Sequence, residues 1–453
     1  MQIPFPFESM LLFGSLATML LIGVFLRANI PFFQHFLIPS CLIGGVLGLI
    51  LLNTGVFRLS VSNLETFAYH FFNISFISVG LTSSDNNANR GFRDKGFFKG
   101  PLWMALSQTI IFNLQAIVGG LGVILFGFFG FKLFPTFGFL APLGFEEGPG
   151  QAVAFGKVWE GLGFEHAATI GLTFAAIGYF LAFFVGVPLA NWGIRKGLAV
   201  HAPKKLPRDF LTGIMPKKQL NRSAGTQTLH SANVDTLAFQ AALVGLVYVL
   251  TYGLVRTLGS FFAPDVASLL WGFFFFFGLI IAFVVRWLMG KAGVDYLIDS
   301  GVQRRITGWS IDFLIISTIM AIKLAIVWEY ILPISTISLF CGVLTTVVLL
   351  FLGKRLWSYN FERTLVIFGT VTGTVSCGLL LLRIVDPDFK TPAMIEVALM
   401  NVIMLAPLAG LLVLVNATVW WNWSLAVTLL AFVAVMVAAF VAMRACNLMQ
   451  APR

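Results

Sequence analysis

The chain has 453 residues, of which 58% are hydrophobic and 11% charged, and its mean hydropathy is +0.92. Soluble domains carry about 25% charged residues because their surfaces face water, so this composition indicates a surface that faces lipid. The formal net charge is +10, but the basic residues lie in short loops between apolar stretches, where the positive-inside rule places them. The charge therefore does not indicate a nucleic-acid partner.

Membrane-spanning stretches are recognised by their length, because a bilayer core about 30 Å thick requires about 20 apolar residues in a helix. Such stretches run approximately over residues 8–26, 38–56, 64–82, 101–130, 166–190, 237–262, 265–289, 309–331, 333–354, 392–416 and 419–444. The first lacks a preceding basic region and a small-residue cleavage site, which indicates a retained span rather than a signal peptide. We therefore predict an all-α polytopic membrane protein with about eleven spans.

Two further stretches, 139–160 and 364–383, are apolar but too rich in glycine and polar residues to be ordinary spans. One long basic linker interrupts the chain and divides it into two halves. The predicted parts are a first half over residues 1–190, the linker over 191–236, a second half over 237–418, and an extra C-terminal span and tail over 419–453.

The basic loops orient the chain across the membrane, because the positive-inside rule places them in the cytoplasm. This assignment works only if 139–160 and 364–383 return to the side they entered from. They are then re-entrant hairpins, the first from outside and the second from the cytoplasm. This topology predicts that the N-terminus lies outside the cell and that the linker and the C-terminus lie in the cytoplasm. The loops used lie around residues 27, 90–99, 195–222, 286–305 and 354–363.

The two halves share one plan of four spans, a hairpin and one further span. The first half begins outside and the second begins inside, so we predict two inverted five-span repeats. The third spans support this pairing, because residues 74–78 and 315–318 place polar groups at corresponding positions. Inverted repeats with broken elements in equivalent places are the architecture of secondary transporters, whose binding site lies near the bilayer midplane.

The first hairpin contains the run Glu146-Glu147-Gly148-Pro149-Gly150-Gln151. Two glycines around a proline forbid a continuous helix and leave backbone groups free, which is tolerable at membrane depth only where they line a cavity. A helix that resumes near Gln151 offers its N-terminus to an anion, so Gly148, Gly150 and Gln151 are candidate ligands. The alternative is a connecting loop at the membrane surface, with both glutamates solvated.

The second hairpin contains Thr372, Gly373, Thr374 and Ser376. Small and hydroxylated residues let backbones approach closely and offer oxygens to a cation or donors to a carboxylate. The alternative is a helix-packing face, since the same residues favour close contact without any ligand. The equivalent position of the first hairpin favours a binding role, so these residues are also candidate ligands.

Charged residues within the spans are functional by default. Lys323 falls inside the span predicted over 309–331, where it binds a ligand, extends to an interface or pairs with Glu329. Asp312 falls near a predicted helix start, where a carboxylate suits the helix dipole. Arg383, at the end of the second hairpin, is either a cytoplasmic anchor or the partner of a carboxylate. The four cysteines and five histidines show no metal-ligand spacing, and no nucleophile–base set indicates an enzyme.

At the two hairpins the sequence resembles the bacterial sodium/glutamate symporter family. The best local match covers residues 144–197, and further similar segments are Ile38-Pro39, Gly44-Gly45, 78–81 and 317–324. The chain departs from the family at several places. It has Gly148 to Gln151 behind two glutamates where the family has a Gly-His-Gly-Thr type of turn. The second hairpin lacks the family's Thr-Pro-Thr and following Asn, residues 404–407 contain no carboxylate, and the C-terminal span is extra.

The resemblance implies a homodimer in the bacterial inner membrane and a mobile unit that carries both hairpins in an elevator motion. It implies sodium as the coupling ion, no cofactor, and glutamate or a related small organic anion as the substrate. The alternative is a channel, or a non-transporting membrane protein that retains the fold. A channel predicts a continuous polar stripe along several spans, whereas the polar residues here concentrate at the two discontinuities.

Overall fold

The computed structural model describes residues 7–56, 59–82, 98–202, 208–216, 225–262, 267, 270–387 and 390–450, and all the regular elements in these segments are helices. Several basic residues that orient the chain lie outside the described residues. These are Arg90, Arg93, Lys95, Lys204, Lys205, Lys217, Lys218 and Arg222.

Nine helices in the described segments are long and apolar enough to cross a membrane, counting α9 and α10 as one. They confirm a multi-pass membrane protein. Eight correspond to predicted spans, and the ninth, α18, covers the predicted second hairpin. The nine are α1 (Glu8–Asn29), α6 (Lys99–Phe128), α9 (Ala167–Phe184) with α10 (Gly186–Arg195), α12 (Thr236–Gly259), α14 (Phe274–Lys291), α17 (Ile331–Gly353), α18 (Asn360–Val385), α19 (Ala393–Leu414) and α21 (Leu425–Ala445).

Three other predicted spans form helices that are shorter or more polar. The remaining helices are shorter: most are single turns or connectors, and α7 and α8 occupy the predicted first hairpin. The former are α3 (Ser40–Asn53), α4 (Val61–Leu81) and α15 (Ser300–Met320); the latter include α2 (Pro31–His35), η1 (Phe137–Phe139), α7 (Leu140–Phe145), α8 (Pro149–Gly161), α11 (Arg208–Thr212), η3 (Asp295–Leu297), α16 (Leu324–Glu329) and α20 (Ala417–Trp420).

The span predicted over residues 309–331 is wrong in its boundaries. The Asp299 side chain accepts a hydrogen bond from the Val302 N–H at 2.6 Å and so starts α15 at Ser300, well before the apolar run. The helix ends at Met320, and Lys323 lies in the extended break before α16, exposed rather than inside a span. Asp312 consequently lies in the second half of α15 and not near its start.

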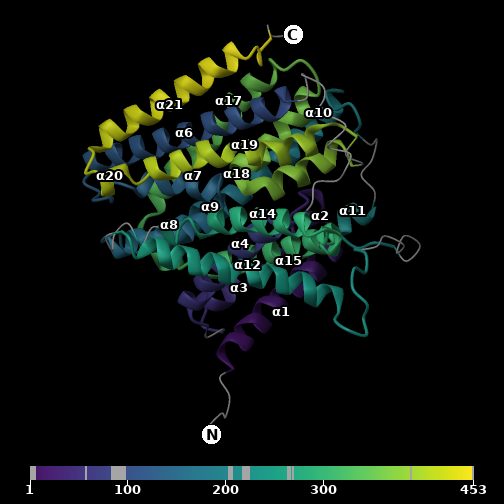
Figure 1. Ribbon diagram of the computed structural model, residues 1–453. Helices are drawn as coiled ribbons and strands as arrows, with labels where there is room; N and C mark the ends of the chain where they lie inside the picture. The colour runs from purple at the N-terminus through teal and green to yellow at the C-terminus, as the bar shows by residue number, and fades with distance from the viewer. Residues whose placement is uncertain are drawn as a thin grey trace.

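The helices form two layers, which are visible in Figure 1 as a lower and an upper group. In the first layer, α4 and α15 pack extensively against each other at the centre. In the second layer, the yellow helix α21 lies along α6, which also contacts α17 and α19. Helix α8 of the second layer contacts α4 of the first, and this is the main contact between the layers.

The packing partners in the two halves of the chain mirror each other. Helix α1 packs on α3, and α3 packs on α15. In the same way, α12 packs on α14, and α14 packs on α4. Each half therefore contributes two helices that cover the central helix of the other half.

Candidate functional site

The first break separates α7 from α8 at Glu146–Gly148. Gly148 adopts φ 85° and ψ −175°, a conformation that is essentially restricted to glycine. Pro149 then occupies the first helical position of α8, where its missing N–H costs no hydrogen bond. The N–H groups of Gly150 and Gln151 follow and, as part of the first helical turn, have no partner within the helix.

The second break interrupts α18 at Gly373 and Thr374. Thr374 adopts φ 74° and ψ 168°, almost the conformation of Gly148, although it carries a β-branched side chain. Such a residue persists only where its surroundings hold it in place, and these residues cluster at functional sites. A methyl group placed on Gly369 would lie 2.7 Å from the Cα atom of Gly378. In a straight helix, nine residues would separate these positions by about 14 Å, so the chain turns back on itself here.

The two breaks lie against one another. A methyl group on Gly148 would lie 2.5 Å from Cγ2 of Thr374 and 4.0 Å from the Tyr179 hydroxyl on α9. The Tyr179 hydroxyl also interacts with the Thr374 side chain. The two discontinuities of the chain therefore meet in the folded structure.

One face of α6 contacts the chain at both breaks. The Gln115 amide donates hydrogen bonds to the Val371 carbonyl, at 3.0 Å, and to the Thr345 hydroxyl, at 3.2 Å. Gln108, two turns earlier on α6, is the polar neighbour of the Glu146 carboxylate. Both glutamines are buried and lie on either side of the middle of α6. The breaks therefore lie opposite the middle of the longest described helix.

Gln151 is a buried polar side chain at this place that lacks a protein partner. It is 0% exposed, and neither its amide oxygen nor its amide nitrogen meets a hydrogen-bonding group of the protein. A buried amide without a partner is costly, so such a group indicates a bound molecule or ion. On α15, which contacts α8, the Thr318 hydroxyl is also buried without a partner.

The other candidate ligands have different surroundings. The Thr372 hydroxyl donates to the Phe368 carbonyl of its own helix at 2.6 Å, and the Thr372 carbonyl packs against Gly178. Gly150 lies against the ring of Phe72 on α4, where a methyl group would overlap the ring. Gly373 is buried at the turn, whereas Ser376 is half-buried on the second arm of α18.

The two glutamates of the first break do not form a solvated surface loop. Glu146 is 3% exposed, and neither carboxylate oxygen meets a hydrogen-bond partner at standard distance and angle. Glu147 is half-buried, with one oxygen enclosed. The surface-loop alternative is therefore wrong for Glu146.

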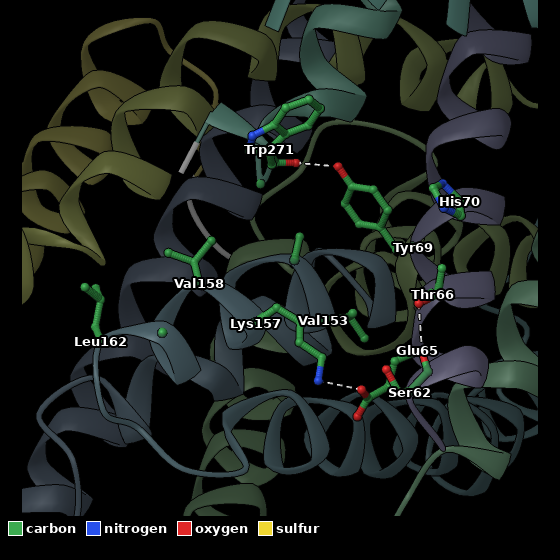
Figure 2. Close-up of a pocket in the computed structure, with 13 residues that line it drawn as sticks. Ser62, Glu65, Thr66, Tyr69, His70, Val153, Lys157, Val158, Leu162 and Trp271 are labelled. Carbon is green, nitrogen blue, oxygen red and sulfur yellow. Dashed lines mark hydrogen bonds and ion pairs between the residues drawn. The ribbon is translucent and has the colours of Figure 1, made fainter. Parts of the chain in front are cut away.

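A pocket of about 720 Å³ lies beside this region, between α4, α8 and residues 271–272 (Figure 2). Val153 and Ala154, on the turn of α8 that follows Gln151, line one wall. Lys157 of α8 and Glu65 of α4 also line the pocket, and the Lys157 Nζ atom lies 2.6 Å from a carboxylate oxygen of Glu65 (Figure 2). The pocket therefore lies between the two layers, along α8 from Val153 onward.

The comparison with known families decides the relationship. The sequence model of the sodium/glutamate symporter matches residues 8–379, which is most of the chain and includes both breaks. The chain belongs to the sodium/glutamate symporter family. Comparisons with curated proteins and with solved structures found no match. The match ends within the second arm of α18, so α19, α20 and α21 of this symporter-family chain lie beyond it.

Membership of the symporter family makes the chain a transporter-type membrane protein.

The structure also shows polar residues near the breaks and between helices that could have been singled out in the sequence but were not. Gln108 and Gln115 are seven residues apart in a predicted span and share a helix face, which was the available signal. The ion pair between Arg363 and Glu396 was also missed, because its partners lie on different helices. Arg383, which the sequence analysis considered instead, is exposed.

Proposed function

We propose that the chain is a secondary active transporter that couples sodium to the uptake of glutamate or a related small organic anion by an elevator motion. The observation that carries this proposal is the contact between the two breaks opposite the middle of α6, beside a buried amide, Gln151, that lacks a protein partner. A membrane protein accommodates irregular backbone at that depth where it binds a solute or an ion.

Two inverted repeats with re-entrant hairpins account for this arrangement. Helices α1, α3, α4 and α6, the α7–α8 unit and α9 correspond to α12, α14, α15 and α17, the two arms of α18, and α19. The mirrored packing of α3 on α15 and of α14 on α4 supports the repeat. So does the shared backbone conformation of Gly148 and Thr374.

The proposed anion site combines the two breaks. The free N–H groups at the start of α8, together with the Gln151 amide, bind a carboxylate of the substrate. The hydroxyls of Thr374 and Ser376 face the same solute or its sodium ion from the second arm, with Gly148, Gly150, Thr372 and Gly373 shaping the backbone around it. Because Thr372 uses its hydroxyl proton within the helix, its oxygen serves only as an acceptor.

The pocket beside α8 is the proposed entry route. In the proposed orientation the N-terminus lies outside and the C-terminus in the cytoplasm of a bacterial inner membrane, so the start of α4 and the end of α8 face outward. Lys157 at the mouth carries a positive charge that attracts an anion, although Glu65 and Glu160 neutralise it in this conformation. The substrate then reaches Gln151 along Val153 and Ala154.

A homodimer through the first layer fits the proposed elevator, because one layer must stay fixed while the other moves. Helix α12 presents an exposed apolar face to lipid or to a second copy of the chain. Its residues are Leu237, Leu246, Val249, Leu250 and Leu254.

Uptake of radiolabelled L-glutamate into proteoliposomes, with and without an inward sodium gradient, tests the proposal. We expect the parent to accumulate glutamate when the sodium gradient is present. The Gln151→Ala and Ser376→Ala substitutions should each weaken glutamate binding by several-fold up to about a hundredfold. The reason is that each hydrogen bond contributes about 0.5–1.5 kcal/mol, or up to about 3 kcal/mol when the partner is charged. Ser335→Ala is a matched control, since Ser335 is exposed on α17 and bonds its own helix. If Gln151→Ala and Ser376→Ala match the parent in affinity and rate, the site lies elsewhere. Passive flux without accumulation would favour the channel.

A further inference from the structure

Glu146 is held at a fixed, buried position by its backbone. It directly follows α7, and its N–H donates to the Pro142 carbonyl at 3.0 Å. The side chain is 3% exposed and cannot reach water without movement of the break. An ionised carboxylate in such a place is strongly unfavourable unless a cation or several donors compensate it.

Neighbouring elements present no cation to this carboxylate within the part of the chain that the structure describes. Glu147 and the uncharged Gln108 are the groups that act on it electrostatically. The helices packed against α7 carry Tyr179 on α9, Cys341 on α17, and Cys377 and Glu362 on α18 as titratable groups, and Glu362 accepts a hydrogen bond from the Val200 N–H. The cations of these elements lie elsewhere: Lys157 of α8 is paired with Glu65 and Glu160, Arg363 of α18 is paired with Glu396, and Arg383 and Lys99 are exposed.

Gln108 matches either protonation state of Glu146. Its amide oxygen is buried and lacks a hydrogen-bond partner. That oxygen can accept the O–H of a carboxylic acid, and after rotation of the amide the N–H groups can donate to a carboxylate. Gln108 can therefore form a hydrogen bond with Glu146 in either protonation state.

The position of Glu146 connects its charge to the solute. It lies two residues before Gly148, which contacts Thr374, and five residues before Gln151. A carboxylate here repels an anion at the start of α8, whereas a neutral carboxylic acid does not. Binding of the proton and binding of the anion therefore favour each other.

We propose that Glu146 is a proton-binding site of the transport cycle, loaded together with the anionic solute, so that each cycle carries one proton in addition to any sodium. The proton passes from external water to the Glu146 carboxylate, moves inward with the break, and returns to water in the cytoplasm. This inference rests on the proposed transport function and adds a coupling ion to it.

Proteoliposomes with equal sodium on both sides and an inside-alkaline pH gradient test the proposal, with L-glutamate as the probe. We expect the gradient to stimulate uptake several-fold in the parent. Glu146→Gln imitates the neutral acid, so this variant should lose the stimulation but still exchange labelled for unlabelled solute. Glu329→Gln, an exposed position on α16, is the matched control and should keep the stimulation. Stimulation that persists in Glu146→Gln would overturn the proposal. It would also be overturned if the pH gradient has no effect on the parent while Glu146→Gln loses sodium-driven uptake, because Glu146 would then be a sodium ligand.

A second measurement needs no transported solute and separates this inference from the proposed function. Infrared difference spectra between acidic and alkaline buffer should show a carboxylic acid C=O band that is absent in Glu146→Gln and shifted in frequency in Gln108→Leu. If glutamate exchange is absent in the parent but the band is present, the choice of solute fails while the proton site stands. A parent spectrum identical to that of Glu146→Gln overturns the proton site whether or not transport occurs.

Discussion

Gly148 shows at the scale of one residue why the first break depends on glycine. Its positive φ is unfavourable for residues with a Cβ atom, and the space beside it is filled by Thr374. We expect Gly148→Ala to lower the free energy of unfolding by more than about 1 kcal/mol and to abolish most uptake, because the two breaks can no longer meet. Thermal unfolding in detergent and glutamate uptake measure the two effects.

Gly245→Ala provides the control for this substitution. Gly245 lies within α12, and a methyl group there meets no atom within 4 Å. Alanine should leave stability equal or slightly higher, since it favours the helix. Equal behaviour of the two variants would show that the close approach of Gly148 to Thr374 is not needed.

The break in the helix at Gly148, just before Gln151, could be predicted from the sequence, because a Gly-Pro-Gly run cannot continue a helix. The partners of these residues could not. Gln108 and Gln115 stand in an apolar stretch whose periodicity is weak, so nothing in the sequence says which helix face meets the breaks. The strain at Thr374 was equally inaccessible, since a β-branched residue is a poor candidate for that conformation.

At the scale of elements, a buried ion pair joins the first turns of α18 and α19. The Arg363 Nε and Nη2 atoms lie 2.7 and 2.6 Å from the two oxygens of Glu396, and both side chains are 4% exposed. Gly100 of α6 leaves the space that the Glu396 carboxylate occupies. We expect Arg363→Met to destabilise the protein by about 3–5 kcal/mol, because it leaves a buried carboxylate alone.

The double variant Arg363→Met with Glu396→Leu distinguishes the contribution of the ion pair to stability from the cost of burying an unpaired carboxylate. Two apolar side chains of similar size avoid the stranded charge, so the double variant should be more stable than Arg363→Met alone. Thermal unfolding of both variants checks this expectation. Equal losses in the single and double variants would show that the helices need the charges themselves.

The start of α15 is the place where the end of the linker docks. The Asp299 carboxylate accepts hydrogen bonds from the N–H and the hydroxyl of Thr226 and from the N–H of Val302. Burial alone would raise the pKa of Asp299, but these hydrogen bonds outweigh it and hold the pKa below its ordinary value. A lowered folded-state pKa contributes stability that is present above the ordinary aspartate pKa and is lost as the pH falls through the folded-state pKa.

We therefore expect the difference in thermal stability between the parent and Asp299→Asn to be constant near neutral pH. The difference should shrink as the pH falls below about 4, where the unfolded-state carboxyl becomes protonated. Asp295→Asn, in the preceding turn, is the control and should show no such profile. A difference that persists unchanged under acidic conditions would mean that charge at Asp299 does not hold the linker.

The presence of most membrane-spanning helices was predictable, because the length of an apolar stretch alone specifies a span. The residues at which the helices begin and end were not, because they depend on local polar contacts. Helix α15 starts at an aspartate cap within a polar segment, which hydropathy does not detect. Helix α18 is apolar enough to cross the membrane, and its reversal at Gly373 depends on packing against α6 and α9. That packing is a tertiary property, and the small residues of the segment only permit it.

At the scale of the whole molecule, the two layers meet along α4 and α8, with the pocket between them. The ion pair between Glu65 and Lys157 bridges this boundary. An elevator motion requires α8 to slide past α4, so the ion pair must break in each cycle. Contacts within a layer, such as those between α4 and α12, persist through the same motion.

Cross-links between the layers and within one layer should therefore have different effects on uptake, which tests whether the second layer moves past the first. Thr66 on α4 and Ala154 on α8 both line the pocket, and the pair Thr66→Cys with Ala154→Cys is introduced with the exposed Cys446 replaced by serine. A short thiol cross-linker should abolish uptake, and reduction should restore it, because the cross-link fixes the two layers. Ile74→Cys on α4 with Ala241→Cys on α12 is the control, since both residues line a second pocket within the first layer. That cross-link should leave uptake unchanged. If uptake continues when mass spectrometry shows complete cross-linking of Thr66→Cys to Ala154→Cys, the layers do not move past each other and the elevator mechanism is wrong for this chain.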